Sequence, residues 1–179
     1  MLKKVDLKYT NRLINHGPLV IVSAENADKR TFTPIAWNMP VEHSPALIAL
    51  TIAKENFVNT LIKKSKEFCV NIPSIDYLDL VLKLGSVSGK EIDKIREYKL
   101  KVKKCKKINC HYWTEAIATI ECKLIKTVGI SEVDIFIGEA LYCSANENFK
   151  NDCWSADKLQ TVHHLGNLNF VTLKKIKRN

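Results

Sequence analysis

A succession of short strand-like runs, separated by turn residues, limits what this chain can fold into. Apolar and β-branched residues dominate residues 19–24, 31–41, 46–53, 68–72, 116–128, 133–145 and 169–176, which is typical of strands. Helices are predicted between them at 57–66, 77–84 and 93–98, with Gly85 just after the second helix. Because strands dominate, the sequence predicts a mainly β fold with short helices, arranged as a closed or nearly closed antiparallel barrel.

Length and composition favour one domain that covers residues 1–179. Hydrophobic residues make up 46% of the chain and charged residues 26%, which is ordinary for a globular protein. No apolar run approaches the ~20 residues of a membrane span. Residues 1–6 lack the apolar core of a signal peptide, so we expect a cytoplasmic protein with no membrane partner.

The six cysteines are expected to be reduced thiols, since no export signal is recognised. No two are spaced as Cys-x-x-Cys, which argues against a zinc or redox motif, and no metal ligand is predicted. Cys69, Cys122 and Cys143 fall in apolar strand runs, where a free cysteine behaves as a small buried hydrophobe. Cys105 and Cys110 lie among lysines, which would lower a thiol pKa.

The formal net charge is +9, and positive charge is densest in residues 99–107, called here the basic strip, with a second block at 174–178. A nucleic-acid-binding protein uses such charge on phosphates. Lysine greatly outnumbers arginine, however, and no aromatic residue is interleaved in the strip to stack on bases. We therefore favour a solvated lysine-rich surface over specific nucleic-acid binding; attraction of an anionic phosphate ligand is a third option.

Residues 33–41 combine side chains that suit contact with a flat ligand. Pro40 has no N–H and interrupts regular strand pairing. Trp37 brings a large ring, and Asn38 brings an amide beside Met39. Such a segment can present backbone N–H and C=O groups to a heteroaromatic ring. The alternative is an edge strand with one surface tryptophan.

Four motifs follow one another in an order that resembles a known family. They are Ala36-Trp37-Asn38-Met39-Pro40-Val41, Ser65-Lys66-Glu67-Phe68-Cys69-Val70-Asn71-Ile72, Ser86-Val87-Ser88-Gly89-Lys90-Glu91-Ile92-Asp93-Lys94 and Ala118-Thr119-Ile120-Glu121-Cys122-Lys123. Together they resemble the flavin reductase-like family, in particular its flavoredoxin-type members, from about residue 17 to the C-terminus. The resemblance implies an FMN-binding split β-barrel whose flavin ring lies against Trp37, Asn38 and Met39.

By that resemblance, Thr51, Asn56 and Thr60 contact the flavin phosphate and ribityl chain. Lys54 joins them because of its charge and position, and the start of the helix near Asn56 offers unpaired N–H groups to an anion. Relatives often carry arginine where this chain has Ala53, which removes a bidentate phosphate donor. Simple helix capping is the alternative role of Asn56.

Ser88, Gly89 and Lys90 form a second predicted phosphate contact, with a hydroxyl, close backbone approach and a positive charge. Their alternative role is a loop that joins two helices. The chain has neither the P-loop spacing nor a G-x-G-x-x-G pattern, so a Rossmann nicotinamide site is not supported. Of the pair His163 and His164, which resembles the family's C-terminal segment near the flavin, His164 is assigned to the ring edge.

The sequence therefore predicts an FMN-binding oxidoreductase of the flavin reductase or flavoredoxin type. The cofactor would carry electrons or hydride through flavin N5, so no catalytic side chain is assigned. NAD(P)H or a redox protein is the expected electron donor, and the family implies a homodimer. Two alternatives stay open: a flavin- or heme-binding module without turnover, and a basic nucleic-acid-binding β-barrel.

Overall fold

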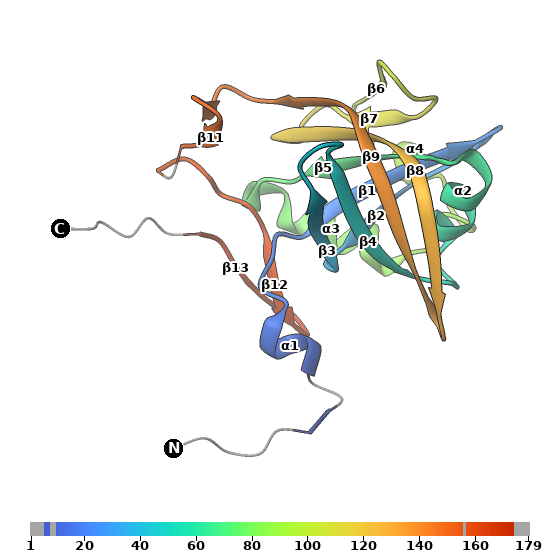
Figure 1. Cartoon of the computed structure of the whole chain (residues 1–179), viewed down its shortest axis with the longest axis horizontal. Helices are drawn as coiled ribbons and strands as arrows, with labels where there is room; N and C mark the ends of the chain where they lie inside the picture. The colour runs from blue at the N-terminus through green and yellow to red at the C-terminus, as the bar shows by residue number, and fades with distance from the viewer. Residues whose placement is uncertain (1–5, 8–9, 156, 174–179) are drawn as a thin grey trace.

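The computed structural model describes residues 6–7, 10–155 and 157–173, and its centre is a seven-stranded antiparallel sheet (Figure 1). The strand order is β2-β1-β5-β8-β9-β4-β3. In chain order the elements are α1 (Thr10–Ile14), β1 (Val20–Asn26), β2 (Lys29–Ile35), β3 (Asn38–Glu42), β4 (Leu47–Ala53), α2 (Phe57–Ser65), β5 (Glu67–Ile72), the 3-10 helix η2 (Ile75–Tyr77), α3 (Leu78–Ser86), α4 (Lys94–Glu97), β6 (Val102–Lys104), β7 (His111–Trp113), β8 (Ala118–Ile130), β9 (Val133–Ala145), β10 (Phe149–Lys150), β11 (Cys153–Trp154), β12 (His163–Gly166) and β13 (Asn169–Val171).

The sheet curls around a large apolar core, which confirms the predicted mainly β barrel. Buried side chains from six strands and from α2 meet in a single cluster: Val20, Val22, Ala24, Ile35, Leu50, Ile52, Val58, Leu61, Ile62, Phe68, Val70, Cys122 and Phe136. A flat sheet could not bring the inner faces of β2, β4 and β8 together in this way. The long hairpin of β8 and β9 agrees with the predicted turn between the two longest strand runs.

Residues 31–41, predicted as one strand, belong to two. β2 pairs with β1, but the chain leaves that ladder after Ile35 and β3 pairs with β4 instead. The backbone N–H of Thr51 donates to the carbonyl of Trp37 at 2.9 Å, which fixes the crossing point. Pro40 lies in β3, at the edge of the sheet, where a missing N–H is tolerated, and the register shifts by a bulge just after it.

The prediction that Gly85 follows the second helix was wrong, because α3 continues through Gly85 to Ser86. Its last turn is held from outside: the ammonium of Lys94 donates to the carbonyl of Leu84 at 2.6 Å. Asn56 does occupy the N-cap position of α2, but its side chain makes no capping hydrogen bond.

The two ends of the described chain meet beside the barrel. Figure 1 shows α1 next to the hairpin of β12 and β13, and Arg12 donates to the Asn167 side-chain oxygen at 3.0 Å between them. Within the described part of the chain, the predicted last strand is observed as Asn169–Val171; residues 174–176 of that prediction and the basic block at 174–178 lie outside it. No helix among the described residues is long and apolar enough to cross a membrane.

All six cysteines are free thiols, but two predictions about them were wrong. Cys143 is exposed, because the last residues of β9 extend beyond the barrel core. Cys105 and Cys110 are buried with Cys69 and Ile108. The hydrogen bond with Cys105 and burial raise the pKa of Cys110 well above its ordinary value, so the neighbouring lysines do not activate these thiols.

Candidate functional site

An apolar cavity lies where the chain passes from β2 to β3, and we call it the Trp37 groove. Its volume is about 410 Å³ and it is lined by Asn11, Ile14, Asn15, Trp37, Asn38, Met39, Ala49, Thr51 and Ile135. Four of these residues, Trp37, Asn38, Met39 and Thr51, were predicted from the sequence to contact a ligand. The lining residues of α1 and β9 were not predicted, since they lie far from the motifs in sequence.

The wall of this groove is held by hydrogen bonds that do not depend on a ligand. Asn38 Nδ2 donates to the Pro18 carbonyl at 2.8 Å, which ties the β2–β3 crossing to the start of β1. That amide nitrogen is therefore used in folding. Trp37 remains 43% exposed and Met39 59% exposed, so large apolar surfaces face the open side of the groove.

His164 lies at one end of the same groove. A small cavity of about 120 Å³ is lined by His164 and Arg12 and shares Trp37, Asn11 and Asn15 with the Trp37 groove. His164 Nε2 lies 2.9 Å from the Asn167 carbonyl; a carbonyl only accepts, so this nitrogen carries a proton.

His163, by contrast, is buried with both ring nitrogens engaged. Nε2 lies 2.8 Å from the Thr161 hydroxyl and Nδ1 lies 2.6 Å from the carbonyl of His16. The structure thus separates the two histidines: His164 lines a cavity beside Trp37, and His163 holds the β12 segment against the N-terminal part of the chain.

A second cavity lies at the start of α2, and we call it the Lys94 cavity. Its volume is about 330 Å³ and it is lined by Thr33, Glu55, Asn56, Phe57, Leu84, Gly85, Ser86, Val87, Ser88, Gly89 and Lys94. It brings together two segments that the sequence predicted to hold one phosphate, because Asn56 comes from the start of α2 and Ser88 and Gly89 come from the loop after α3. The first turn of α2, with no side-chain cap, leaves N–H groups for an anion there.

Lys94 is the most informative residue of this cavity, and sequence reasoning did not assign it a role. It is 3% exposed, and its ammonium donates to the carbonyls of Phe32, at 3.1 Å, and Leu84, at 2.6 Å. Among the residues that the structure describes, no carboxylate is paired with it. Burial lowers the pKa of Lys94 to about 8. The sequence signal that could have pointed to Lys94 is its place at the end of the third motif, directly after Asp93.

Gly89 allows the loop to approach the barrel closely. A Cβ at this position would lie 2.3 Å from the Thr31 hydroxyl oxygen and 3.1 Å from a ring carbon of Phe57. Any side chain would therefore push the loop away from β2 and from the start of α2. The glycine sets the width of the Lys94 cavity, in line with the close backbone approach expected from the sequence.

Four residues predicted to contact the phosphate end lie outside the Lys94 cavity, and one of them, Thr51, lines the Trp37 groove instead. Lys54 is exposed, and its ammonium donates to the carbonyl of Ser131 in the β8–β9 turn. Thr60 lies one turn further along α2 than the lining residues. Lys90 lines a neighbouring cavity with Glu91.

A buried carboxylate fixes α2 to the sheet. Asp134 on β9 accepts from Lys63 Nζ at 2.6 Å and from Asn59 Nδ2 at 2.8 Å. Burial raises the pKa of Asp134, but the bonds from Lys63 and Asn59 outweigh burial and lower it overall. The start of α2 is thereby held at the cavity.

The segment that runs from β2 to β3 connects the two cavities. Thr33 in β2 lines the Lys94 cavity, and Trp37, just beyond the end of β2, lines the groove; four residues span at most about 14 Å. An elongated ligand with an anionic end and a flat, apolar end matches this arrangement.

Comparison with known proteins agrees with the fold and the motifs. The model of the flavin reductase-like domain matches residues 12–163, so the chain belongs to the flavin reductase-like family. The Escherichia coli K12 protein YddH is 33% identical over 178 residues, which cover 96% of this chain and 94% of YddH.

Solved structures share the fold at lower identity. Flavoredoxin from Methanosarcina acetivorans superposes with a TM-score of 0.86 at 17% identity, covering 99% of this chain and 95% of its own. Flavoredoxin of Desulfovibrio vulgaris (Miyazaki F) gives a TM-score of 0.85 at 21% identity, with 99% and 97% covered. An FMN-binding protein from Thermus thermophilus gives 0.85 at 19% identity, with 100% and 97% covered. The fold of this chain is therefore that of the FMN-binding split barrels.

Proposed function

We propose that this protein is an FMN-binding flavoprotein of the flavin reductase and flavoredoxin type. The observation that carries the proposal is Lys94, a buried cation held by two carbonyls in a cavity at the start of α2. A buried charge without a counter-ion is costly, and an anionic ligand removes that cost. Family membership and the FMN-binding relatives make the flavin phosphate the best candidate for that anion.

The phosphate end of FMN would be held by Lys94, by Ser88 and by the N–H groups at the start of α2. Gly89 leaves room for the loop to close on the ligand. This chain has Ala53 where relatives often carry an arginine, and Lys94 would supply the positive charge for the phosphate instead. Thr51 lies toward the other end, in the lining of the Trp37 groove, where the ribityl chain and ring would begin.

The ring end would be held by Trp37, Met39 and the backbone around Asn38. His164 lies within reach of a ring edge, since its cavity shares Trp37 with the groove. FMN, when bound, supplies a ring that carries electrons or hydride through N5. The chain contributes binding, orientation and shielding from water, with NAD(P)H or a redox protein as donor.

We also propose that a second copy of the chain covers the open side of the groove. β3 is an edge strand of the sheet, and large apolar side chains around it are exposed: Ile14, Trp37, Met39 and Val41. An unpaired apolar edge next to a ligand groove favours association. Light scattering should give the mass of a dimer, and Val41→Lys should shift it toward the monomer.

A titration of the apo protein with FMN and with riboflavin tests the proposal. Saturable quenching of flavin fluorescence at one site per chain is expected, with FMN bound at least tenfold more tightly than riboflavin because of its phosphate. No change at tens of micromolar FMN would refute flavin binding. If FMN binds, NADH or NADPH oxidation by the loaded protein then distinguishes a reductase from a carrier.

A further inference from the structure

The side-chain nitrogen of Lys94 has room for a reaction partner. It is buried, and it donates to the carbonyls of Phe32 and Leu84. Among the residues that the structure describes, these two carbonyls are its hydrogen-bond partners. An ammonium has three N–H groups, so one position on the nitrogen is left without a protein partner. In the neutral amine that position holds the lone pair, which is what a nucleophile needs.

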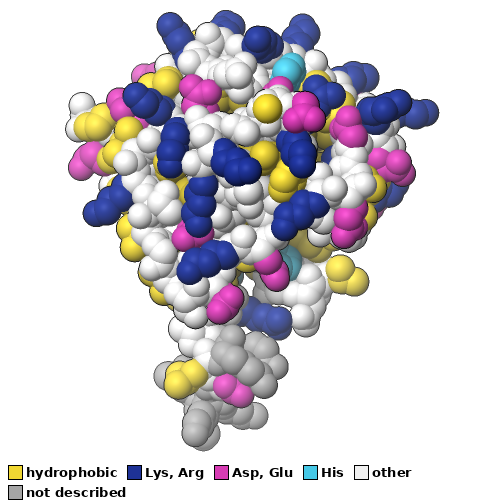
Figure 2. Space-filling view, turned by 90° about the vertical axis from the view of Figure 1, so that its right-hand side faces the viewer, with side chains coloured by type: hydrophobic (Ala, Val, Ile, Leu, Met, Phe, Trp, Pro, Cys, Tyr) yellow, Lys and Arg dark blue, Asp and Glu magenta, His cyan; other side chains and the backbone are white. Residues whose placement is uncertain are grey.

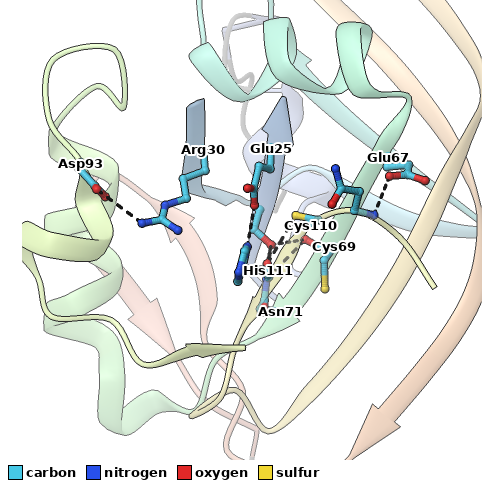
Figure 3. Close-up of polar contacts among 10 residues, drawn as sticks. Glu25, Arg30, Glu67, Cys69, Asn71, Asp93, Cys110 and His111 are labelled. Atoms are coloured by element: carbon cyan, nitrogen blue, oxygen red, sulfur yellow. Dashed lines mark hydrogen bonds and ion pairs between the residues drawn. The ribbon is translucent and has the colours of Figure 1, made fainter. Parts of the chain in front are cut away.

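The nearby carboxylates do not neutralise this lysine. Asp93, its neighbour in sequence, accepts from two backbone N–H groups at the start of α4 and lies 3.7 Å from Arg30. Figure 3 shows Arg30 reaching from β2 toward Asp93. Glu55, in the lining of the Lys94 cavity, is exposed. Burial therefore lowers the pKa of Lys94 to about 8. About half of its amine is neutral at pH 8, against about 0.3% for an ordinary lysine.

The cavity around this amine also offers donors to a phosphate. The start of α2 has no side-chain cap at Asn56, which leaves backbone N–H groups for an anion. The Ser88 hydroxyl accepts from the backbone N–H of Lys90 at 3.2 Å and keeps its own hydrogen to donate. A small ligand whose phosphate contacts these groups has its other end in the same cavity of about 330 Å³ as Lys94.

We propose that Lys94 is a site of covalent acylation by small acyl phosphates. The neutral amine attacks the acyl carbon, the bond between that carbon and the bridging oxygen breaks, and phosphate leaves with the electron pair. The nitrogen passes one proton to the departing phosphate, and an amide replaces the amine. Acylation removes the positive charge of Lys94 and so weakens FMN binding; this consequence rests on the proposed function, whereas the acylation itself does not.

Incubation of the apo protein with acetyl phosphate at pH 8, followed by digestion and mass spectrometry, tests the inference. Figure 2 shows basic side chains spread over the side of the molecule where α2 lies in Figure 1. Two exposed lysines, Lys64 on α2 and Lys90, are matched references in the same digest. Lys94 should be acetylated about tenfold faster than either, because more of its amine is neutral and the phosphate is bound beside it. p-Nitrophenyl acetate transfers the same acyl group without a phosphate, so with this donor the preference for Lys94 should be about fivefold smaller.

The outcomes separate this inference from the proposed function. Acetylation of Lys94 no faster than that of Lys64 and Lys90, or an equal preference with both acyl donors, overturns the acyl phosphate site. Saturation with FMN should slow the acetylation of Lys94 about tenfold and leave Lys64 unchanged. If FMN binds in a separate titration but does not protect Lys94, the acylation site stands and the flavin phosphate lies elsewhere. If FMN does not bind, the proposed function fails, and the comparison of the two acyl donors still decides the inference.

Discussion

The Lys94 cavity and the Trp37 groove differ in almost every physical property. The Lys94 cavity is bounded by a buried ammonium, serine hydroxyls and the first turn of a helix. The Trp37 groove is bounded by exposed Trp37 and Met39 and by Ala49 and Ile135. The first is suited to an anionic group, and the second to a flat apolar group.

This difference means that the two ends should respond to different changes in a ligand. Electrostatic contacts in a buried site are strong but specific to the anion, whereas apolar packing is tolerant of polar additions elsewhere in the molecule. FMN and riboflavin share the ring and differ in the phosphate. Comparing these two ligands in single variants therefore measures each end of the site separately.

The largest effect is expected from Lys94→Met. A charge-assisted contact contributes ~2 kcal/mol to binding, which corresponds to about 30-fold in affinity. Its loss should therefore weaken FMN binding by about that factor. Riboflavin binding should change less than threefold. Fluorescence titrations with both ligands measure this, and circular dichroism checks that the variant folds.

Lys90→Met is the informative companion, since the sequence assigned the phosphate to Lys90 and the structure places this residue in the lining of a neighbouring cavity, with Glu91. Its effect on FMN affinity should be clearly smaller. An equal or larger loss than that of Lys94→Met would return the phosphate to Lys90 and contradict the assignment made from burial.

The pH dependence of FMN binding should show a second effect of the same lysine. With its pKa lowered to about 8 by burial, free Lys94 loses its charge above pH 8, and FMN affinity should fall by up to about tenfold per pH unit. Stability should change in the opposite direction. Between pH 8 and about 10.5 the unfolded chain holds more protons at this site than the folded chain, so unfolding free energy rises with pH.

Calorimetric binding and thermal unfolding across this pH range, in wild type and in Lys94→Met, isolate the contribution. The contribution of Lys94 to the fall in FMN affinity and to the rise in unfolding free energy above pH 8 should be missing in Lys94→Met. A wild-type FMN affinity that is constant from pH 7 to pH 9.5 would show that Lys94 is not the anion partner.

The sequence predicted the barrel well because strand periodicity and the β8–β9 turn are local signals. It located the groove through Trp37, Asn38 and Met39, and the start of α2 through Asn56. It missed Lys94, because the sequence around one lysine among many does not indicate burial; its hydrogen bonds to the carbonyls of Phe32 and Leu84 appear only in the structure.

The splitting of residues 31–41 into two strands was missed for a related reason. Which strand pairs with residues 38–42 depends on where β4 lies, and that is a property of the whole sheet. Lys54 was assigned to the phosphate by proximity in sequence, but its side chain is engaged by the β8–β9 turn. Long-range contacts of this kind leave no pattern in the neighbouring residues.

A smaller effect is expected at the ring end. Trp37→Ala should weaken FMN and riboflavin by the same factor, about fivefold, because an aromatic contact contributes ~1 kcal/mol beyond area burial. The ratio of the two affinities should stay constant. A loss confined to FMN would show that the two cavities are not independent and that Trp37 affects the phosphate end.

The smallest effect is expected from the basic strip. Its lysines Lys99, Lys101, Lys103, Lys104, Lys106 and Lys107 are all exposed. Lys101 pairs with Glu115 at 2.9 Å, and the ammonium of Lys106 lies 4.5 Å from the ring centre of Tyr142. Such surface contacts contribute little to stability.

Replacing Lys103, Lys104, Lys106 and Lys107 by Gln should therefore leave the affinities for FMN and riboflavin within about twofold of wild type, since none of the four lines either cavity. Any binding of DNA or RNA by the wild type should be weak and should collapse between low and physiological salt, because it depends on counterion release. Filter binding at two salt concentrations measures this. Tight, sequence-selective binding at physiological salt, abolished by the four substitutions, would make the strip a functional surface and the flavin site a secondary feature of the molecule.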